Sequence, residues 1–168
     1  MKRIIILTAL FLILLPVTQT KAKTKVPEPT FEETVETMVR EHKVMLDRLI
    51  AAWEHRQEEI NLLAEVIYHE NWHTDKEHLA AYYTGAVVMN RVNSKAWPDT
   101  VKKVLYQKGQ YSTTKLFFTK EIPEECYEMA RDIYKNGTPD VPENVIFQAM
   151  RPLGKTWKKV NTDYFCYG

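Results

Sequence analysis

The chain has 168 residues, of which 45% are hydrophobic and 27% charged, as is usual for one globular domain with a short extension. The first 22 residues contain Lys2, Arg3 and Lys21 and no acid, so the remainder contains 20 basic and 22 acidic side chains. This balance offers no basic surface for nucleic acid or for an anionic membrane. We therefore expect no nucleic-acid partner.

Residues 1–22 have the pattern of an export signal. Two basic residues precede an uncharged apolar run over residues 4–17, which is shorter than the roughly 20 residues that span a bilayer as a helix. The run fits the apolar region of a signal peptide, and Ala22 offers a small residue at a cleavage point. The alternative is an uncleaved signal anchor, which alone would attach the protein to a membrane. Both interpretations place the remainder outside the cytoplasm.

Residues 23–56 are predicted to form a linker and an amphipathic helix. Thr30 and Glu33 have the spacing of a capping box, which starts a helix. An apolar stripe follows at helical spacing, formed by Val35, Met38, Met45, Leu49, Ala52 and Trp53. We expect this helix to pack on the rest of the protein or to act as a spacer. A short coiled coil that joins two chains is the alternative.

Residues 57–168 are predicted to form the main domain. Its first helix should start near Gln57 and end in the polar loop 71–77, and a second should cover residues 77–92. Gly85 lies inside the second helix, where a glycine costs about 1 kcal/mol relative to alanine, so it indicates close approach of another helix. A short helix before Tyr106 and one from Pro123 follow.

The C-terminal part of the domain is β-prone. Residues 144–150 and 163–167 are separated by a loop with Gly154, which predicts a two-stranded ribbon, and the basic segment 155–159 is interpreted as a solvated turn. The fold class is therefore α+β and mostly helical. Cys126 and Cys166 are 40 residues apart and either form a disulfide or are two small buried side chains.

The first helix of the domain brings one carboxylate, Glu70, to its C-terminal end. With His69 and His73 it spells H-E-x-x-H, the pattern of zinc peptidases. Polar residues follow at the positions where a zinc-binding helix should continue. His78 would lie off the metal-binding face of such a helix, so the sequence does not indicate a third ligand. A zinc peptidase with His69 and His73 as ligands remains the alternative function.

A carboxylate at the end of an apolar helix is also typical of glycan-cleaving sites of the lysozyme and lytic-transglycosylase type. Apolar surroundings disfavour the charged form and raise the pKa of the carboxyl, so that it can donate a proton near neutral pH. Val66 and Ile67 lie one turn before Glu70 and are placed to supply such surroundings. The pattern alone is weak, because exposed or ion-paired glutamates are more common.

Further segments add specificity. In chain order, the segments that carry a resemblance are LLAEVIYHE (62–70), AVVMNRV (86–92), WPDTV (97–101), VLYQ (104–107), QYS (110–112), VIFQ (145–148) and YFCY (164–167). They resemble the SleB/CwlJ-type cell wall hydrolases, which include spore-cortex-lytic enzymes. The resemblance covers about two-thirds of the chain.

This resemblance implies a lysozyme-like or lytic-transglycosylase-like domain, with Glu70 as the catalytic residue and no cofactor. It implies that the partner is the glycan strand of peptidoglycan and that the protein is secreted and associated with the cell wall. The family commonly reads E-A-R-G-E at the end of the active helix, whereas residues 70–74 here read E-N-W-H-T. The Arg and the second acid are lost, so a catalytically inactive wall-binding module is a further alternative.

The mechanism depends on a second acid. A glycosidase needs another carboxylate about 5–10 Å away, and none is signalled, since Glu65, Asp75 and Glu77 are expected on solvated faces. The lytic transglycosylase that the resemblance implies avoids this need. Glu70 would protonate the bond after N-acetylmuramic acid and then deprotonate the 6-hydroxyl of that sugar, which closes a 1,6-anhydro ring.

Substrate-binding candidates come from the same segments. Gln110 and Tyr111 are expected to bind acetamido and hydroxyl groups. Four more candidates would line a groove for sugar rings: Tyr68, Phe147, Gln148 and Tyr164. Aromatic residues at these spacings are also typical of a core. Asn90 and Arg91 are interpreted as a buried structural pair.

Overall fold

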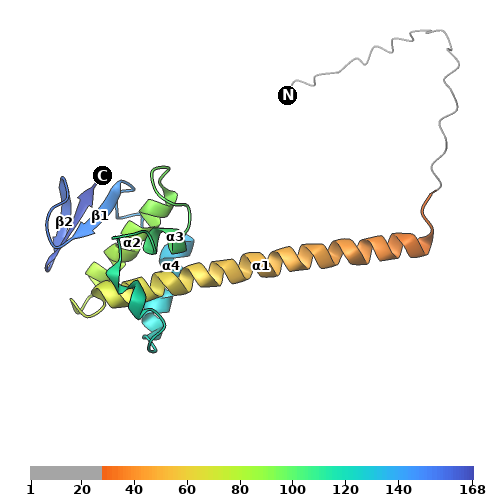
Figure 1. Cartoon of the computed structure of the whole chain (residues 1–168), viewed down its shortest axis with the longest axis horizontal. Coiled ribbons are helices and arrows are strands. Elements are labelled where there is room, and N and C mark those ends of the chain that lie inside the picture. The colour runs from red at the N-terminus through yellow and green to blue at the C-terminus, as the bar shows by residue number, and fades with distance from the viewer. Residues whose placement is uncertain (1–27) are drawn as a thin grey trace, which may run out of the picture. The chain divides into compact units, whose positions relative to one another are not determined.

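The structure is a computed structural model that describes residues 28–168 (Figure 1). The predicted export signal lies outside the described residues. Two units are distinguished, one up to His42 and one from Lys43 to Gly168. Within residues 28–168, no helix is both long enough and apolar enough to cross a membrane.

The first helix, α1, runs without a break over Phe31–Asn71. Its start confirms the capping box, since the Glu33 carboxylate accepts from the Thr30 backbone N–H at 2.8 Å and the Thr30 hydroxyl accepts from the Glu33 N–H at 3.2 Å. The predicted start of a new helix near Gln57 is wrong. Residues 54–59 contain good helix formers and neither Gly nor Pro, so nothing in them ends a helix.

The apolar stripe of α1 is exposed to solvent over the part of the helix that belongs to the second unit. Met45, Leu49 and Trp53 are each more than half exposed, so they do not pack on that unit as we expected. Burial begins at Glu59 and continues through most of the last three turns. A dimer formed through the stripe stays a prediction.

Three more α-helices and a 3₁₀ helix belong to the second unit: α2 (Leu79–Asn93), α3 (Val101–Leu105), η1 (Ser112–Leu116) and α4 (Glu124–Asn136). One face of α2 packs with α1, α3 and α4 in the larger core, and the other packs against the sheet. Gly85 makes this possible. A Cβ there would lie 2.6 Å from Ile133 Cδ1 of α4 and 3.1 Å from Ile67 Cδ1 of α1, which confirms the predicted close approach.

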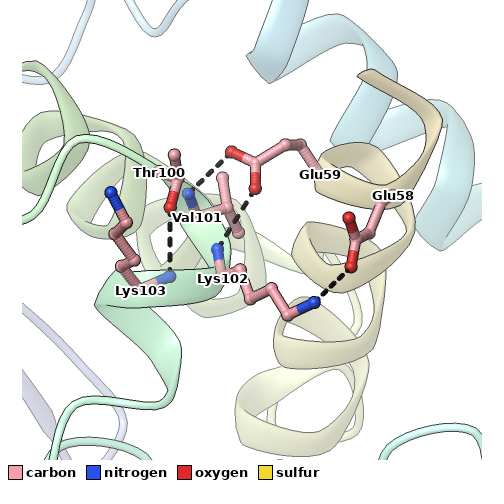
Figure 2. A network of polar contacts seen from close by, with 6 residues as sticks. All are labelled: Glu58, Glu59, Thr100, Val101, Lys102 and Lys103. Atoms are coloured by element: carbon pink, nitrogen blue, oxygen red, sulfur yellow. Dashed lines mark hydrogen bonds and ion pairs between the residues drawn. The ribbon is translucent and has the colours of Figure 1, made fainter. Parts of the chain in front are cut away.

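A buried carboxylate fastens α3 to α1 (Figure 2). Glu59 is 3% exposed and accepts from the backbone N–H groups of Val101 at 2.7 Å and Lys102 at 3.2 Å. A helix of five residues is not stable alone, and these bonds satisfy N–H groups at its start that have no partner within the helix. Beside this contact, the exposed Lys102 ammonium pairs with Glu58 at 2.7 Å.

The C-terminal residues form a three-stranded antiparallel sheet in the order β1–β3–β2, which lies beside α2 (Figure 1). Its strands are β1 (Val145–Ala149), β2 (Thr156–Val160) and β3 (Asp163–Tyr167). The predicted pairing of β1 with β3 is confirmed, with Val145 opposite Tyr167 and Ala149 opposite Tyr164.

The predicted solvated turn over residues 155–159 is wrong, because most of this segment is the strand β2. Its Trp157 ring packs edge-on against Tyr83 of α2 with the ring centroids 5.0 Å apart. Only Trp157 and Val160 are shielded in an otherwise exposed strand, so the apolar pattern is too short to indicate β structure.

The two cysteines are both buried and do not form a disulfide. Cys126 lies on α4 and Cys166 on β3. The interpretation as small buried side chains is confirmed.

Candidate functional site

A small cavity opens at the end of α1, where Glu70 lies in the last turn. Its volume is about 290 Å³, and it is lined by Glu70, Arg91, Gln110, Tyr111, Gln148, Ala149, Met150 and Asp163. These residues come from α1, α2, the loop before η1, the end of β1 and the start of β3. Segments far apart in the sequence therefore meet around Glu70.

The Glu70 carboxyl is half-buried and held by one strong hydrogen bond. The Thr113 hydroxyl of η1 donates to Glu70 Oε1 at 2.5 Å. Burial raises the pKa of Glu70, and the negative charge of Asp163 raises it further, while the Thr113 bond and His69 act in the opposite direction. The carboxyl therefore keeps its proton to a higher pH than an exposed glutamate.

Thr113 was missed in the sequence, although it directly follows the QYS segment. Replacing Thr113 with Val removes the hydroxyl with little change in shape, so we expect the pKa of Glu70 to rise. The rise follows because the lost bond favours the charged carboxylate. A ¹³C NMR titration of the Glu70 carboxyl should shift to higher pH, while Thr119→Val, at a hydroxyl bonded to the Leu116 carbonyl, should not move it. A titration that stays in place or shifts to lower pH in Thr113→Val contradicts this assignment.

Arg91 fixes one wall of the cavity. Its Nε donates to the Ile146 carbonyl at 2.7 Å, and its Nη1 donates to Gln110 Oε1 at 3.1 Å and to the Tyr111 hydroxyl at 3.4 Å. The neighbouring Asn90 amide donates to two backbone carbonyls of the segment around β1. The predicted buried pair is confirmed, and Arg91 also connects α2 with two substrate-binding candidates.

Tyr111 contributes a neutral hydroxyl to this wall. Burial raises the pKa of Tyr111 to about 12, although the nearby Arg91 charge acts against this. The phenol therefore stays protonated near neutral pH and can both donate and accept a hydrogen bond.

The second carboxylate in the cavity belongs to Asp163, the first residue of β3. Asn71 is 2% exposed, and the orientation of its amide is assigned from its neighbours. In this orientation Asn71 donates to Asp163 Oδ2 at 2.9 Å and accepts from Gln148 Nε2 at 2.7 Å. Burial raises the pKa of Asp163, and the Asn71 bond opposes the rise.

Sequence reasoning missed Asp163 and considered three other acids. Glu65 is not on a solvated face but buried, with its Oε2 3.2 Å from His69 Nε2. Asp75 caps the start of α2, where it accepts from the N–H groups of Leu79 and Ala80. Glu77 is exposed, as expected. Asp163 lies 93 positions after Glu70, and only the packing of the sheet brings the two together.

The substrate-binding candidates divide into two groups. Gln110, Tyr111 and Gln148 line the cavity with Glu70. The other three lie elsewhere: Tyr68 against His73 and the Lys120 ammonium, Phe147 against Trp97, and Tyr164 beneath Lys159.

The two histidines of the H-E-x-x-H pattern do not share a helix face. α1 ends at Asn71, so His73 lies in the following turn and is exposed. The His69 ring is turned toward Glu65 and stacks on Phe117, with the centroids 5.8 Å apart. Among the described residues 28–168, no three His, Cys, Asp or Glu side chains are grouped so that they could hold a metal ion. The helical geometry on which a zinc peptidase depends is therefore not formed.

Comparison with known proteins identifies a family. A family model described as Cell Wall Hydrolase matches residues 77–165. The matched segment contains all the cavity-lining residues listed above except Glu70, which lies just before it. No curated protein and no solved structure matches the chain, so the likeness to a lysozyme or lytic-transglycosylase fold stays a prediction.

Proposed function

The chain belongs to the cell wall hydrolase family, and from this premise we propose that it cleaves the glycan strands of peptidoglycan as a lytic transglycosylase. One observation carries the proposal. Glu70 faces a cavity at the end of α1, and burial raises the pKa of its carboxyl. A neutral carboxylic acid at such a place can protonate the oxygen of a glycosidic bond.

In the first step Glu70 is the general acid. It transfers its proton to the oxygen that links N-acetylmuramic acid to N-acetylglucosamine, and the bond from C1 to that oxygen breaks. The electron pair of the bond goes to the leaving oxygen, so positive charge develops at C1. Proton transfer of this kind contributes about 10²–10⁴-fold to a rate.

In the second step Glu70 is the general base. Its carboxylate accepts the proton of the 6-hydroxyl of the same muramic acid, whose oxygen bonds to C1 and closes the 1,6-anhydro ring. The Thr113 hydroxyl supports this step, because its hydrogen bond to Oε1 stabilises the carboxylate that the first step leaves behind. Glu70 regains its proton and is ready for another cycle.

Three polar side chains are proposed to hold the sugars: Gln110, Tyr111 and Gln148. Gln110 and Tyr111 are held by the same Arg91 guanidinium, so they keep their places before substrate arrives. Amide and phenol groups match the acetamido and hydroxyl groups of the amino sugars. Peptidoglycan lies outside the cytoplasm, which agrees with the export signal proposed for residues 1–22.

A water-using muramidase is the second candidate. It is favoured by Asp163, because a second carboxylate in the cavity is what a glycosidase needs in addition to its acid. The two candidates cleave the same bond and differ in the group that attacks C1, which is either water or the 6-hydroxyl.

Mass spectrometry of the products tests the proposal. The purified protein would digest peptidoglycan with and without a chelator. Muropeptides with 1,6-anhydro ends, released equally in both samples, are expected from a lytic transglycosylase. Reducing ends would indicate the muramidase, and binding without cleavage would indicate a wall-binding module. Intact glycan with chelator-sensitive cleavage of peptides would overturn the proposal in favour of a zinc peptidase.

A further inference from the structure

Glu70 and Asp163 face one cavity from two different elements. Glu70 comes from the end of α1, and Asp163 comes from the start of β3, the central strand of the sheet. Among the described residues no hydrogen bond joins the two carboxyl groups: Glu70 Oε1 accepts from the Thr113 hydroxyl, and Asp163 Oδ2 accepts from the Asn71 amide. A sugar bound in this cavity would lie against both.

Asp163 is held in place by a polar network centred on Asn71. The Asn71 amide nitrogen donates to Asp163 Oδ2, and the Asn71 amide oxygen accepts from the Gln148 amide and from the Thr84 hydroxyl. Asn71 and Thr84 are both buried. Asn71 follows Glu70 directly in the chain, so the residue that orients Asp163 is joined covalently to the proposed acid.

The two carboxyl groups differ in what surrounds them. An aspartate ordinarily ionises at a lower pH than a glutamate; burial raises the pKa of Asp163, and the hydrogen bond from the Asn71 amide opposes that rise. Once Asp163 is ionised, its charge raises the pKa of Glu70. The other ionisable groups at the cavity are Arg91 and Tyr111, with His69 beside Glu70, and Tyr111 stays neutral. Negative charge on Asp163 therefore favours the protonated form of Glu70.

Resting on the proposed function, we propose that Asp163 is a second catalytic carboxylate, which faces C1 of the muramic acid and stabilises the positive charge that develops there. Glu70 gives its proton to the leaving oxygen, and the broken C1–O bond leaves its electron pair on that oxygen. The 6-hydroxyl oxygen then bonds to C1, and its proton returns to Glu70. Asp163 forms no bond and loses no proton, so it stabilises the cation in the manner of a preorganised charge.

Asp163→Asn in the full chain tests this role, because the amide has nearly the shape of the carboxylate but no charge. The rate of strand cleavage is expected to fall about 10²–10³-fold, as when one preorganised stabilising group is removed from an active site. The products should keep their 1,6-anhydro ends. The matched control is Asp132→Asn, which changes an exposed carboxylate on α4 that accepts from the Asn136 amide, and this variant should cleave at the wild-type rate.

A pH profile separates this role from a merely structural one. kcat/KM falls at high pH when Glu70 loses its proton, and the charge of Asp163 delays that loss. Without the charge, the pKa of Glu70 drops, and the falling limb of the profile should move to lower pH in Asp163→Asn. A lost hydrogen bond to Asn71 alone would slow the enzyme without moving the limb.

Three outcomes overturn the proposal. The first is an Asp163→Asn variant that cleaves at the wild-type rate. The second is a pH profile of kcat/KM whose high-pH limb does not move in Asp163→Asn. The third is a wild-type enzyme that makes reducing ends while Asp163→Asn does not, because Asp163 would then activate water. Should the Asn variant not fold, as judged by circular dichroism, Asp163→Ser serves as the second variant. Failure of the proposed function is seen separately in the wild-type protein, which would then leave the glycan intact or make reducing ends that the Asp163→Asn variant makes as well.

Discussion

Replacing Glu70 with Gln is expected to lower the rate of glycan-strand cleavage about 10³-fold, within the range that general acid–base catalysis contributes. The amide oxygen can still accept from the Thr113 hydroxyl, so the local structure should persist. What the variant lacks is the proton for the leaving oxygen and the carboxylate that later accepts one from the 6-hydroxyl. The change from carboxyl to amide therefore removes both the general-acid step and the general-base step.

The rate is measured as the release of soluble muropeptides from purified peptidoglycan. Glu77→Gln is the matched control, because Glu77 is an exposed glutamate close in sequence and outside the cavity lining, and it should behave as wild type. Unfolding midpoints of both variants show whether either change acts through stability. A Glu70→Gln enzyme within tenfold of the wild-type rate would exclude Glu70 as the acid.

Replacing Glu59 with Ala is expected to lower the free energy of unfolding by about 3 kcal/mol. The change removes the carboxylate that accepts hydrogen bonds from the backbone N–H groups of Val101 and Lys102. Hydrogen bonds to charged groups contribute about 1.5–3 kcal/mol each, and the N–H of Val101 would be left buried and unpaired. Since these bonds fasten α3 to α1, their loss should also loosen the loop that leads to Gln110 and Tyr111.

Urea denaturation measures this effect. Glu59→Gln keeps one carbonyl acceptor and should lose less stability than Glu59→Ala. Glu58→Ala is the control on the neighbouring position, where an exposed ion pair with Lys102 is broken and little change is expected. Equal stability of Glu59→Ala and Glu58→Ala would contradict the structural role given to Glu59 (Figure 2).

The family and the position of the proposed acid could be recognised from local patterns. The spaced segments from residue 62 onward indicated the cell wall hydrolase family, which the match over residues 77–165 confirms. Periodicity predicted the helix that ends near Glu70, and Gly85 marked the close helix contact. These features depend on residues that are close to one another along the chain, and sequence periodicity detects relations of this kind.

Other features of the candidate site could not be predicted in this way. The H-E-x-x-H pattern fits a zinc site only if one helix carries both histidines, and α1 ends at Asn71, before His73. Gln110, Tyr111 and Gln148 were candidates on the same grounds as Tyr68, Phe147 and Tyr164. Only the packing of distant segments separates the three that line the cavity from the three that do not.

By itself the sequence determined a mostly helical α+β domain with a closing β structure, and it placed a carboxylate at the end of an apolar helix. These properties follow from helix periodicity, capping and β propensity, which act between residues close along the chain. The tertiary structure decided that β2 joins the sheet and that Thr113 and Asp163 meet at Glu70. The physical reason is burial. Which side chains lose water, and which charges then act on each other, depends on contacts between distant segments that form only when the core packs.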